Sequence, residues 1–290
     1  DGTHRLQEGQ FDQAVAEFGK AVAINPRDAR FHLSRGAAYF SLGETEEAIA
    51  EYEQSLRAKP DAPEAQINLA MDWKRLGKED QAVDAYREAL RLKPDLLPAY
   101  FELGLLYLNA KHDSAAAELF ESLVKAKPTA ESHLVIGQAY LNSGRTELAL
   151  NNFRQATQLK PDLAQAHLLL GSALLKKNLR QEAAESCRLA LQLDANSSAA
   201  RTMLSRILAQ NSLEYLNNGR WDDAQAEIQE LLKTDANSAE AHLLLGTVFA
   251  NKKQFAEAAD EYEAFLKMAP NSPNASRVRL EIERLRKMPG

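Results

Sequence analysis

Residues 29–62, ARFHLSRGAAYFSLGETEEAIAEYEQSLRAKPDA, contain the pattern that decides the fold of this 290-residue chain. A proline equivalent to Pro60, or an alanine in its place, recurs along the sequence at Pro26, Pro60, Pro94, Pro128, Pro161, Ala195, Ala236 and Pro270. Successive members are separated by 34, 34, 34, 33, 34, 41 and 34 residues. A fixed period of this size indicates a stack of similar supersecondary units.

Each unit is predicted to be a helix, a turn and a second helix, because its apolar residues recur at spacings of three, four and seven. Small residues occupy position 8 of the unit at Gly36, Ala70, Gly104, Gly137, Gly171 and Gly246. Large or apolar residues, mostly aromatic, occupy position 24 at Phe18, Tyr52, Tyr86, Phe120, Phe153, Cys187, Ile228 and Tyr262. A small residue where two helices cross closely avoids overpacking, and the ring fills the remaining volume.

Two further positions predict where the helices end. Position 15 is often glycine, as at Gly43, which supplies the positive φ that closes the first helix. The proline then ends the second helix and sets the angle to the next unit. Alanine replaces this proline at Ala195 and Ala236, so we expect those two helix ends to be less sharply terminated.

These positions together resemble the tetratricopeptide repeat family, and the resemblance covers nearly the whole chain. It implies an all-α fold, a right-handed superhelical solenoid of antiparallel helix pairs whose first helices line a concave groove. Members of this family usually act as scaffolds for protein–protein interaction. The groove that the resemblance implies therefore becomes the first place to look for function.

The repeat boundaries predict a domain organisation in five parts. Residues 1–28 are a truncated first repeat, 29–197 are five repeats, 198–238 are a repeat with an extended first helix, 239–272 are the last repeat, and 273–290 are a C-terminal capping helix. The chain starts at Asp1, partway through a repeat, so we interpret it as a fragment or processed form. Its localisation is not predicted, because targeting signals are not observable in such a piece.

The longest spacing reflects seven extra residues before the last repeat. The segment Ser198–Asn217 has no glycine or proline and is predicted to be one helix of about 20 residues, roughly 30 Å long. We expect it to overhang the array by two turns. Neutral drift, a docking spur and a subdomain break are all open explanations for this overhang.

The composition argues against several classes of function. The net charge is −6, with acidic and basic residues mixed along the chain, which disfavours nucleic-acid binding. No apolar run approaches the roughly 18 residues that span a bilayer, so no direct membrane insertion is expected. The common nucleophile, nucleotide and zinc motifs are absent, so we predict no enzyme, no catalytic residues, no cofactor and no metal.

The histidines and the cysteine are predicted to be structural. Four histidines, His32, His133, His167 and His242, fall at position 4 of their repeats. Such positions in neighbouring repeats are about 10 Å apart, too far for one ion, so they are predicted to pack between helices. Cys187, the single cysteine, excludes an internal disulfide and is predicted to be an inert buried thiol.

The candidate binding residues lie in the first helices, at positions that the family resemblance places on the groove. They are Leu33, Phe40, Ile67, Asn68, Met71, Lys74, Phe101, Leu105, Leu108, Leu134, Gln138, Leu141, Leu168, Ser172 and Leu175. This stripe is largely apolar, and soluble proteins seldom expose such patches without a binding role. The alternative is that adjacent first helices pack these leucines against each other.

The leading hypothesis is a non-catalytic scaffold that holds a largely hydrophobic peptide or helix in this groove. It predicts that changing Leu108 and Leu141 together to glutamate abolishes partner capture and preserves helicity. The clamp that some family members use for acidic C-terminal tails is missing, because only Asn68 matches it. Two alternatives remain: the array is the substrate-recruiting arm of a larger enzyme, or it self-associates through its terminal repeats.

Overall fold

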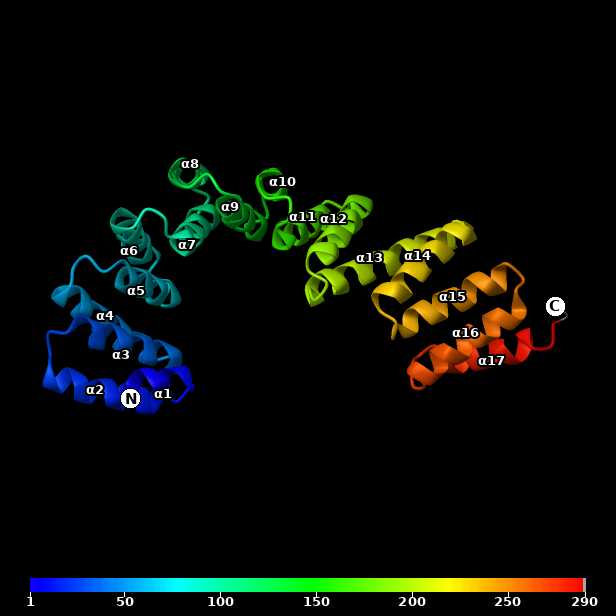
Figure 1. The fold of residues 1–290 in the computed structure, drawn as a ribbon, viewed down its shortest axis with the longest axis horizontal. Coiled ribbons are helices and arrows are strands. Elements are labelled where there is room, and N and C mark those ends of the chain that lie inside the picture. The colour runs from blue at the N-terminus through cyan, green and yellow to red at the C-terminus, as the bar shows by residue number, and fades with distance from the viewer. Residues whose placement is uncertain (289–290) are drawn as a thin grey trace. The chain divides into compact units, whose positions relative to one another are not determined.

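The computed structural model describes residues 1–288, and within that range the chain forms 17 α-helices and no strand (Figure 1). The predicted all-α fold is confirmed. The chain divides into two compact units, Asp1–Leu159 and Lys160–Gly290, which are described separately below. Pro289 and Gly290, the last two residues of the predicted capping segment, lie outside the described residues.

The first unit contains ten helices. Their bounds are α1 Gly2–Gln7, α2 Phe11–Ile24, α3 Ala29–Leu42, α4 Thr45–Ala58, α5 Pro63–Arg75, α6 Glu79–Leu92, α7 Leu97–Asn109, α8 Asp113–Ala126, α9 Ala130–Asn142 and α10 Thr146–Leu159. The second unit continues with α11 Ala164–Lys176, α12 Arg180–Leu193, α13 Ser198–Asn217, α14 Trp221–Thr234, α15 Ala239–Asn251, α16 Phe255–Met268 and α17 Ala275–Leu285. Odd- and even-numbered neighbours from α1/α2 to α15/α16 pack as pairs joined by short turns.

The two helices of a pair cross where position 8 meets position 24. A Cβ built on Gly36 would lie 2.5 Å from the ring of Tyr52, and one built on Gly137 would lie 2.6 Å from the ring of Phe153. Both rings are almost completely buried. A glycine at position 8 of these repeats is therefore required by the ring beneath it, as the sequence pattern predicts.

The turn inside each pair needs a left-handed residue. Gly43, the first residue after α3, has φ +86° and its N–H donates to the Phe40 carbonyl at 3.1 Å. Where glycine is missing at the same position, the backbone adopts the same conformation, with φ about +60° at Lys111, Asn178 and Lys253. The repeat thus imposes this turn even on residues that adopt it at a cost.

The expectation of looser helix ends at Ala195 and Ala236 is wrong. Asp194 after α12 has φ −137° and ψ 90°, close to the −142° and 91° of Lys59 before Pro60. Asp194 Oδ1 accepts a hydrogen bond from Asn196 N at 3.0 Å, and Asp235 Oδ1 accepts one from Asn237 N at 3.1 Å. An aspartate that bonds the backbone two residues on replaces the conformational restriction of proline.

Helix α13 has the bounds that the sequence predicts, but its extra turns are packed. Ala200 and Leu204, in the first two turns, are buried, and α13 contacts α12 as well as α14. Its first turn is capped by Ser197, whose hydroxyl oxygen accepts from Ala200 N at 3.3 Å. The extension is therefore part of the core of the second unit and does not stand free.

The connection between α8 and α9 is one residue shorter than the others between repeats. Three residues, 127–129, join these helices, whereas four residues, 93–96, join α6 and α7. Of the two helices in the repeat before it, α9 contacts mainly α7 and only marginally α8, whereas α3, α5 and α7 each contact the second helix of the preceding repeat more extensively. The single 33-residue spacing in the sequence marks this change.

Helix α17 covers the end of the last repeat. Val278, Ile282 and Leu285 face a buried cluster on α16 that contains Tyr262 and Phe265. The apolar residues of α17 recur with the period of a helix and form one face, which covers the apolar surface that the last full helix pair would otherwise expose.

The close crossing gives a test of the fold with a matched control. Gly137→Ala places a Cβ against the fully buried ring of Phe153, so it should lower the free energy of unfolding by roughly 1–3 kcal/mol. Gly19→Ala, inside α2, meets only the Arg35 guanidinium at 3.7 Å and should raise stability by about 0.5–1 kcal/mol. Urea denaturation followed by circular dichroism measures both, and the account fails if the two changes have the same sign.

Candidate functional site

The predicted groove residues divide by burial. Three are buried and therefore do not line an open surface: Leu108 is 2% exposed, Leu134 7% and Leu141 3%. Leu108 lies on α7 and the other two on α9, the pair of first helices that pack on each other. These three side chains are therefore not available on an open surface, and their burial agrees with the alternative of packing between first helices. A Leu108→Glu, Leu141→Glu protein would bury two carboxylates, so it cannot test binding alone.

The other twelve predicted residues keep some exposure. Met71 and Lys74 are exposed, and the others are half-buried: Leu33, Phe40, Ile67, Asn68, Phe101, Leu105, Gln138, Leu168, Ser172 and Leu175. Leu33 and Phe40 also pack against a buried cluster that includes Tyr52 and Leu69, so part of their apolar surface serves the core. Leu168, Ser172 and Leu175 belong to the second unit.

A cavity of about 510 Å³ in the first unit brings three of the predicted residues together. They are Phe40 on α3 and Met71 and Lys74 on α5, and the remaining lining comes from Ser41, Arg75, Tyr86 and Glu102. Met71 is 39% exposed, one of the most exposed apolar side chains on a first helix. The volume falls within the usual range of ligand pockets in proteins.

Charged side chains hold two sides of this cavity. The Arg75 guanidinium lies over the Phe40 ring, 5.4 Å from its centroid, and its Nη1 donates to the Phe40 carbonyl at 3.2 Å. Lys74 Nζ donates to Glu102 Oε2 at 2.5 Å, which links α5 to α7. Both partners of this ion pair remain partly exposed, so the pair is screened by water and open to competition.

The base of the cavity contains a hydroxyl without a partner. Tyr86, at position 24 of its repeat, is fully buried, and its Oη has no hydrogen-bond partner among the described atoms. Burial, with a contribution from the Glu102 carboxylate, raises the pKa of Tyr86, so the hydroxyl is a donor at all ordinary pH. A buried polar atom left unpaired is costly and calls for an explanation.

Two family models match the sequence of this chain. One, described as the C-terminal domain of cilia and flagella-associated protein 70, matches residues 63–280, and one for the tetratricopeptide repeat matches residues 2–63. The chain is a tetratricopeptide repeat protein. Over residues 63–280 it belongs to the family of that C-terminal domain. No curated protein has a significantly similar sequence.

Solved structures resemble this tetratricopeptide repeat protein in fold. Yeast Tom70 is 15% identical with a TM-score of 0.55, and the match covers 95% of this chain and 58% of that one. The C-terminal part of a repeat protein from Cytophaga hutchinsonii is 16% identical, covering 96% of this chain and 97% of that one, with a TM-score of 0.49. YrrB, described as "a TPR protein with an unusual peptide-binding site", is 23% identical, covering 63% and 95%, with a TM-score of 0.41. At these identities the likeness to Tom70 supports the fold alone.

The tetratricopeptide repeats of the second unit form a cavity from corresponding positions. It measures about 440 Å³ and lies between α15, α16 and α17, with Thr247, Ala250 and Tyr262 on one side and Arg277 and Glu281 on the other. In this cavity the tyrosine hydroxyl has a hydrogen-bond partner, because Tyr262 Oη lies 3.3 Å from Thr247 Oγ1. The unpaired hydroxyl is thus a feature of the first unit's cavity and not of the repeat position.

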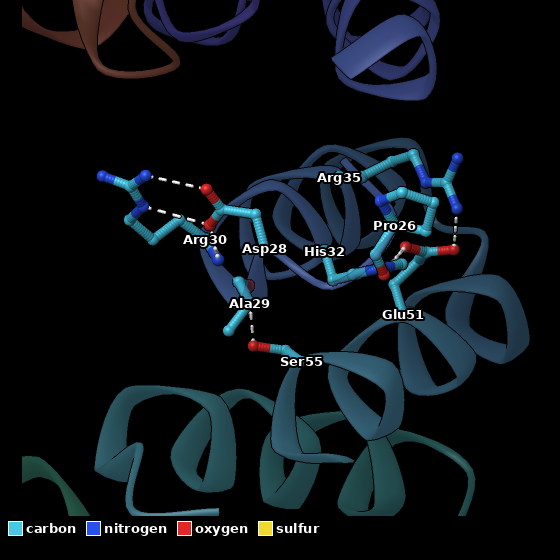
Figure 2. Close-up of polar contacts among 8 residues, drawn as sticks. All are labelled: Pro26, Asp28, Ala29, Arg30, His32, Arg35, Glu51 and Ser55. Atoms are coloured by element: carbon cyan, nitrogen blue, oxygen red, sulfur yellow. Dashed lines mark hydrogen bonds and ion pairs between the residues drawn. The ribbon is translucent and has the colours of Figure 1, made fainter. Parts of the chain in front are cut away.

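The position-4 histidines form hydrogen bonds that join neighbouring elements. In Figure 2, His32 lies between the Pro26 carbonyl and Glu51, with Nε2 2.9 Å from Pro26 O and Nδ1 2.8 Å from Glu51 Oε2. Arg35 pairs with the other oxygen of Glu51 (Figure 2).

The same contacts recur in other repeats of this tetratricopeptide array. His167 Nε2 lies 2.8 Å from the Pro161 carbonyl, His133 Nδ1 lies 3.0 Å from Asn152 Oδ1, and His242 Nδ1 lies 2.6 Å from Glu261 Oε2. The sequence predicted packing at these positions, and the structure adds a hydrogen bond from the first helix to the linker or to the second helix.

The described residues show no reactive thiol, metal site or membrane-spanning helix. Cys187 is fully buried, and burial raises its thiol pKa to about 11, as expected for an inert thiol. Across residues 1–288, no three His, Cys, Asp or Glu side chains gather closely enough to hold a metal ion. No described helix combines the length and apolar character that a bilayer crossing requires.

Sequence reasoning missed Tyr86, Arg75 and Glu102 as cavity residues. The repeat pattern assigns Tyr86 to the core by its position, and it does not single out Arg75 or Glu102. A signal was present in the register: a tyrosine at position 24 faces position 6 of the next repeat, 16 residues later, as Tyr52 faces Asn68. The same spacing of 16 residues in the next repeat predicts that Tyr86 lies near Glu102.

Asp72 is a buried carboxyl at a position that is apolar in most repeats. It lies on α5 at position 10, where five other repeats have Ala38, Leu106, Ala139, Ala173 and Val248, and where His4 and Glu214 of the remaining two are exposed. Its side chain is fully buried, and neither carboxyl oxygen has a hydrogen-bond partner among the described atoms. Burial raises the pKa of Asp72 to about 6, and the nearby Arg75 only partly opposes the rise.

This raised pKa predicts the pH dependence of stability with its sign. The folded state binds the proton of Asp72 more tightly than the unfolded chain, so its contribution to the free energy of unfolding falls as pH rises from about 4 to about 6. Asp72→Ala should therefore raise stability at pH 7 by roughly 1–3 kcal/mol and have much less effect at pH 4.

Denaturation of both proteins across this pH range measures the difference. Asp84→Ala, at an exposed carboxylate of α6, is the matched control and should change neither the stability nor its pH profile by more than about 0.5 kcal/mol. A loss of stability in Asp72→Ala at pH 7 would show that the carboxylate has a stabilising partner.

Proposed function

We propose that this protein is a non-catalytic interaction module that binds a largely apolar peptide segment of a partner protein in the first-unit cavity between α3, α5 and α7. The observation that carries the proposal is the exposure of Met71 beside Phe40 in a cavity of about 510 Å³. Tetratricopeptide repeats typically mediate protein interactions, which agrees with this function.

The size of the cavity favours a peptide side chain with its flanking backbone. Phe40 and Met71 offer an apolar contact, and each large apolar side chain that is buried contributes roughly 1.5–3 kcal/mol. Ordering a flexible segment offsets part of that gain, so we expect moderate affinity. Met71, at position 9, is exposed, and Phe40, at position 12, is half-buried and uses only part of its ring in the packing of its helix pair.

The buried leucines narrow the binding surface relative to the sequence hypothesis. Leu108, Leu134 and Leu141 are removed from it by the packing of α7 on α9. The proposal therefore places the peptide on α3, α5 and the first turns of α7.

Selection of random linear peptides displayed on phage, followed by affinity measurement on the purified protein, tests the function. Met71→Glu replaces the apolar contact with a charge beside Glu102 and should weaken the selected peptides by about tenfold or more. Leu148→Glu, on α10 of the same unit and 45% exposed, makes the same change outside the cavity and should leave affinity unchanged.

If the selected peptides bind Met71→Glu as tightly as the unchanged protein, or if selection returns no binding peptide, this cavity is not the binding site.

A further inference from the structure

The buried hydroxyl of Tyr86 is the feature of this cavity that the apolar contacts leave unexplained. Tyr86 is fully buried at the base of the cavity, and no described atom accepts its proton. A possible acceptor for the Tyr86 hydroxyl lies at the matching position of the next repeat, because the residue 16 positions later is Glu102. In the preceding repeat the equivalent pair interacts, since hydrogen bonding by Asn68 opposes the rise that burial causes in the pKa of Tyr52.

Glu102 forms an ion pair with Lys74 in the free protein and makes no hydrogen bond to the Tyr86 hydroxyl. Its Oε2 lies 2.5 Å from Lys74 Nζ, and the ion pair spans from α7 back to α5 at the rim of the cavity. Lys74 is partly exposed and therefore accessible to a second carboxylate. The other cation of the lining, Arg75, is occupied by the ring and carbonyl of Phe40.

We propose that the bound segment carries a carboxylate next to its apolar side chain, and that this carboxylate takes Lys74 from Glu102 so that Glu102 accepts the Tyr86 hydroxyl. The inference rests on the proposed function, because it names the chemistry of the peptide in the same cavity. In the free protein one ion pair is formed and one hydroxyl is unpaired. In the complex an ion pair to the ligand is formed and the hydroxyl is paired.

Other ligand chemistries do not give the same result. A cationic segment would compete for Glu102, which leaves Tyr86 unpaired and Lys74 without its carboxylate. An uncharged segment leaves the Lys74–Glu102 pair in place and can pair the hydroxyl only through one of its own carbonyl oxygens. An acidic segment pairs Lys74, releases Glu102 for the hydroxyl, and complements a lining with Lys74 and Arg75 against Glu102.

Paired peptides test the exchange. Peptides selected on the unchanged protein are synthesised twice, once with their acidic residues and once with each Glu or Asp replaced by Gln or Asn. The acidic form should bind the unchanged protein about tenfold more tightly than the amide form. Tyr86→Phe removes the group that gains a partner, so the preference should shrink to about threefold or less.

Two controls separate this effect from a loss of structure. Tyr86→Phe removes only an unpaired polar atom, so its thermal midpoint in the absence of peptide should equal or exceed that of the unchanged protein. Tyr100→Phe is a matched change at a buried tyrosine of the same unit, whose hydroxyl lies 3.4 Å from the Pro94 carbonyl. It should keep the full preference for the acidic peptide.

The outcomes distinguish the inference from the function on which it rests. Peptides that bind through Met71 without preferring the acidic form, or a preference that is intact in Tyr86→Phe, overturn the exchange and leave the function standing. Binding that ignores Met71→Glu overturns both.

Discussion

The close crossing of two helices over a residue without a side chain is the constraint on which the rest of this structure depends. Gly36 under Tyr52 and Gly137 under Phe153 leave no room for a single additional carbon. Because the crossing point is fixed, the rotation of the first helix about its axis is fixed as well. This rotation leaves part of Phe40 at position 12 and of Met71 at position 9 exposed, and both line the cavity.

The sequence predicted whatever the repeat imposes on every copy. The helix pairs, the left-handed turn and the bounds of α13 all follow from positions that recur, so many weak signals reinforce one another. Local substitutions were harder to interpret. Alanine in place of proline at Ala195 and Ala236 suggested frayed ends, but the preceding aspartates form the turn that proline would have favoured.

The candidate site was predicted in part, and the failure has a structural cause. Phe40, Met71 and Lys74 do meet in one cavity, because they lie at outward positions of helices packed in the usual way. Leu108 and Leu141 at position 12 and Leu134 at position 5 are buried, because a linker one residue short lets α9 lie against α7. The pattern of one repeat cannot show which neighbouring helix will cover its surface. Nor can it show that Glu102 pairs with Lys74 while the Tyr86 hydroxyl has no partner, since that depends on three side chains from three helices.

Buried polar atoms without a hydrogen-bond partner among the described atoms occur in both units. They belong to Arg35, Asp72, Tyr86 and Ser205, and of these only Tyr86 lines the first-unit cavity. An unpaired group lowers stability, and proteins tolerate one most often where function requires it. The Tyr86 hydroxyl therefore agrees with a binding role for this cavity.

The methionine methyl groups offer the most direct measurement of the central claim. The chain has four methionines, Met71, Met203, Met268 and Met288, and of these only Met71 lines the first-unit cavity. With 13C-labelled methionine methyl groups, titration with a selected peptide should shift the Met71 signal in proportion to binding and leave the other three in place. A peptide that binds without moving the Met71 signal, or that shifts another methionine instead, would contradict the account.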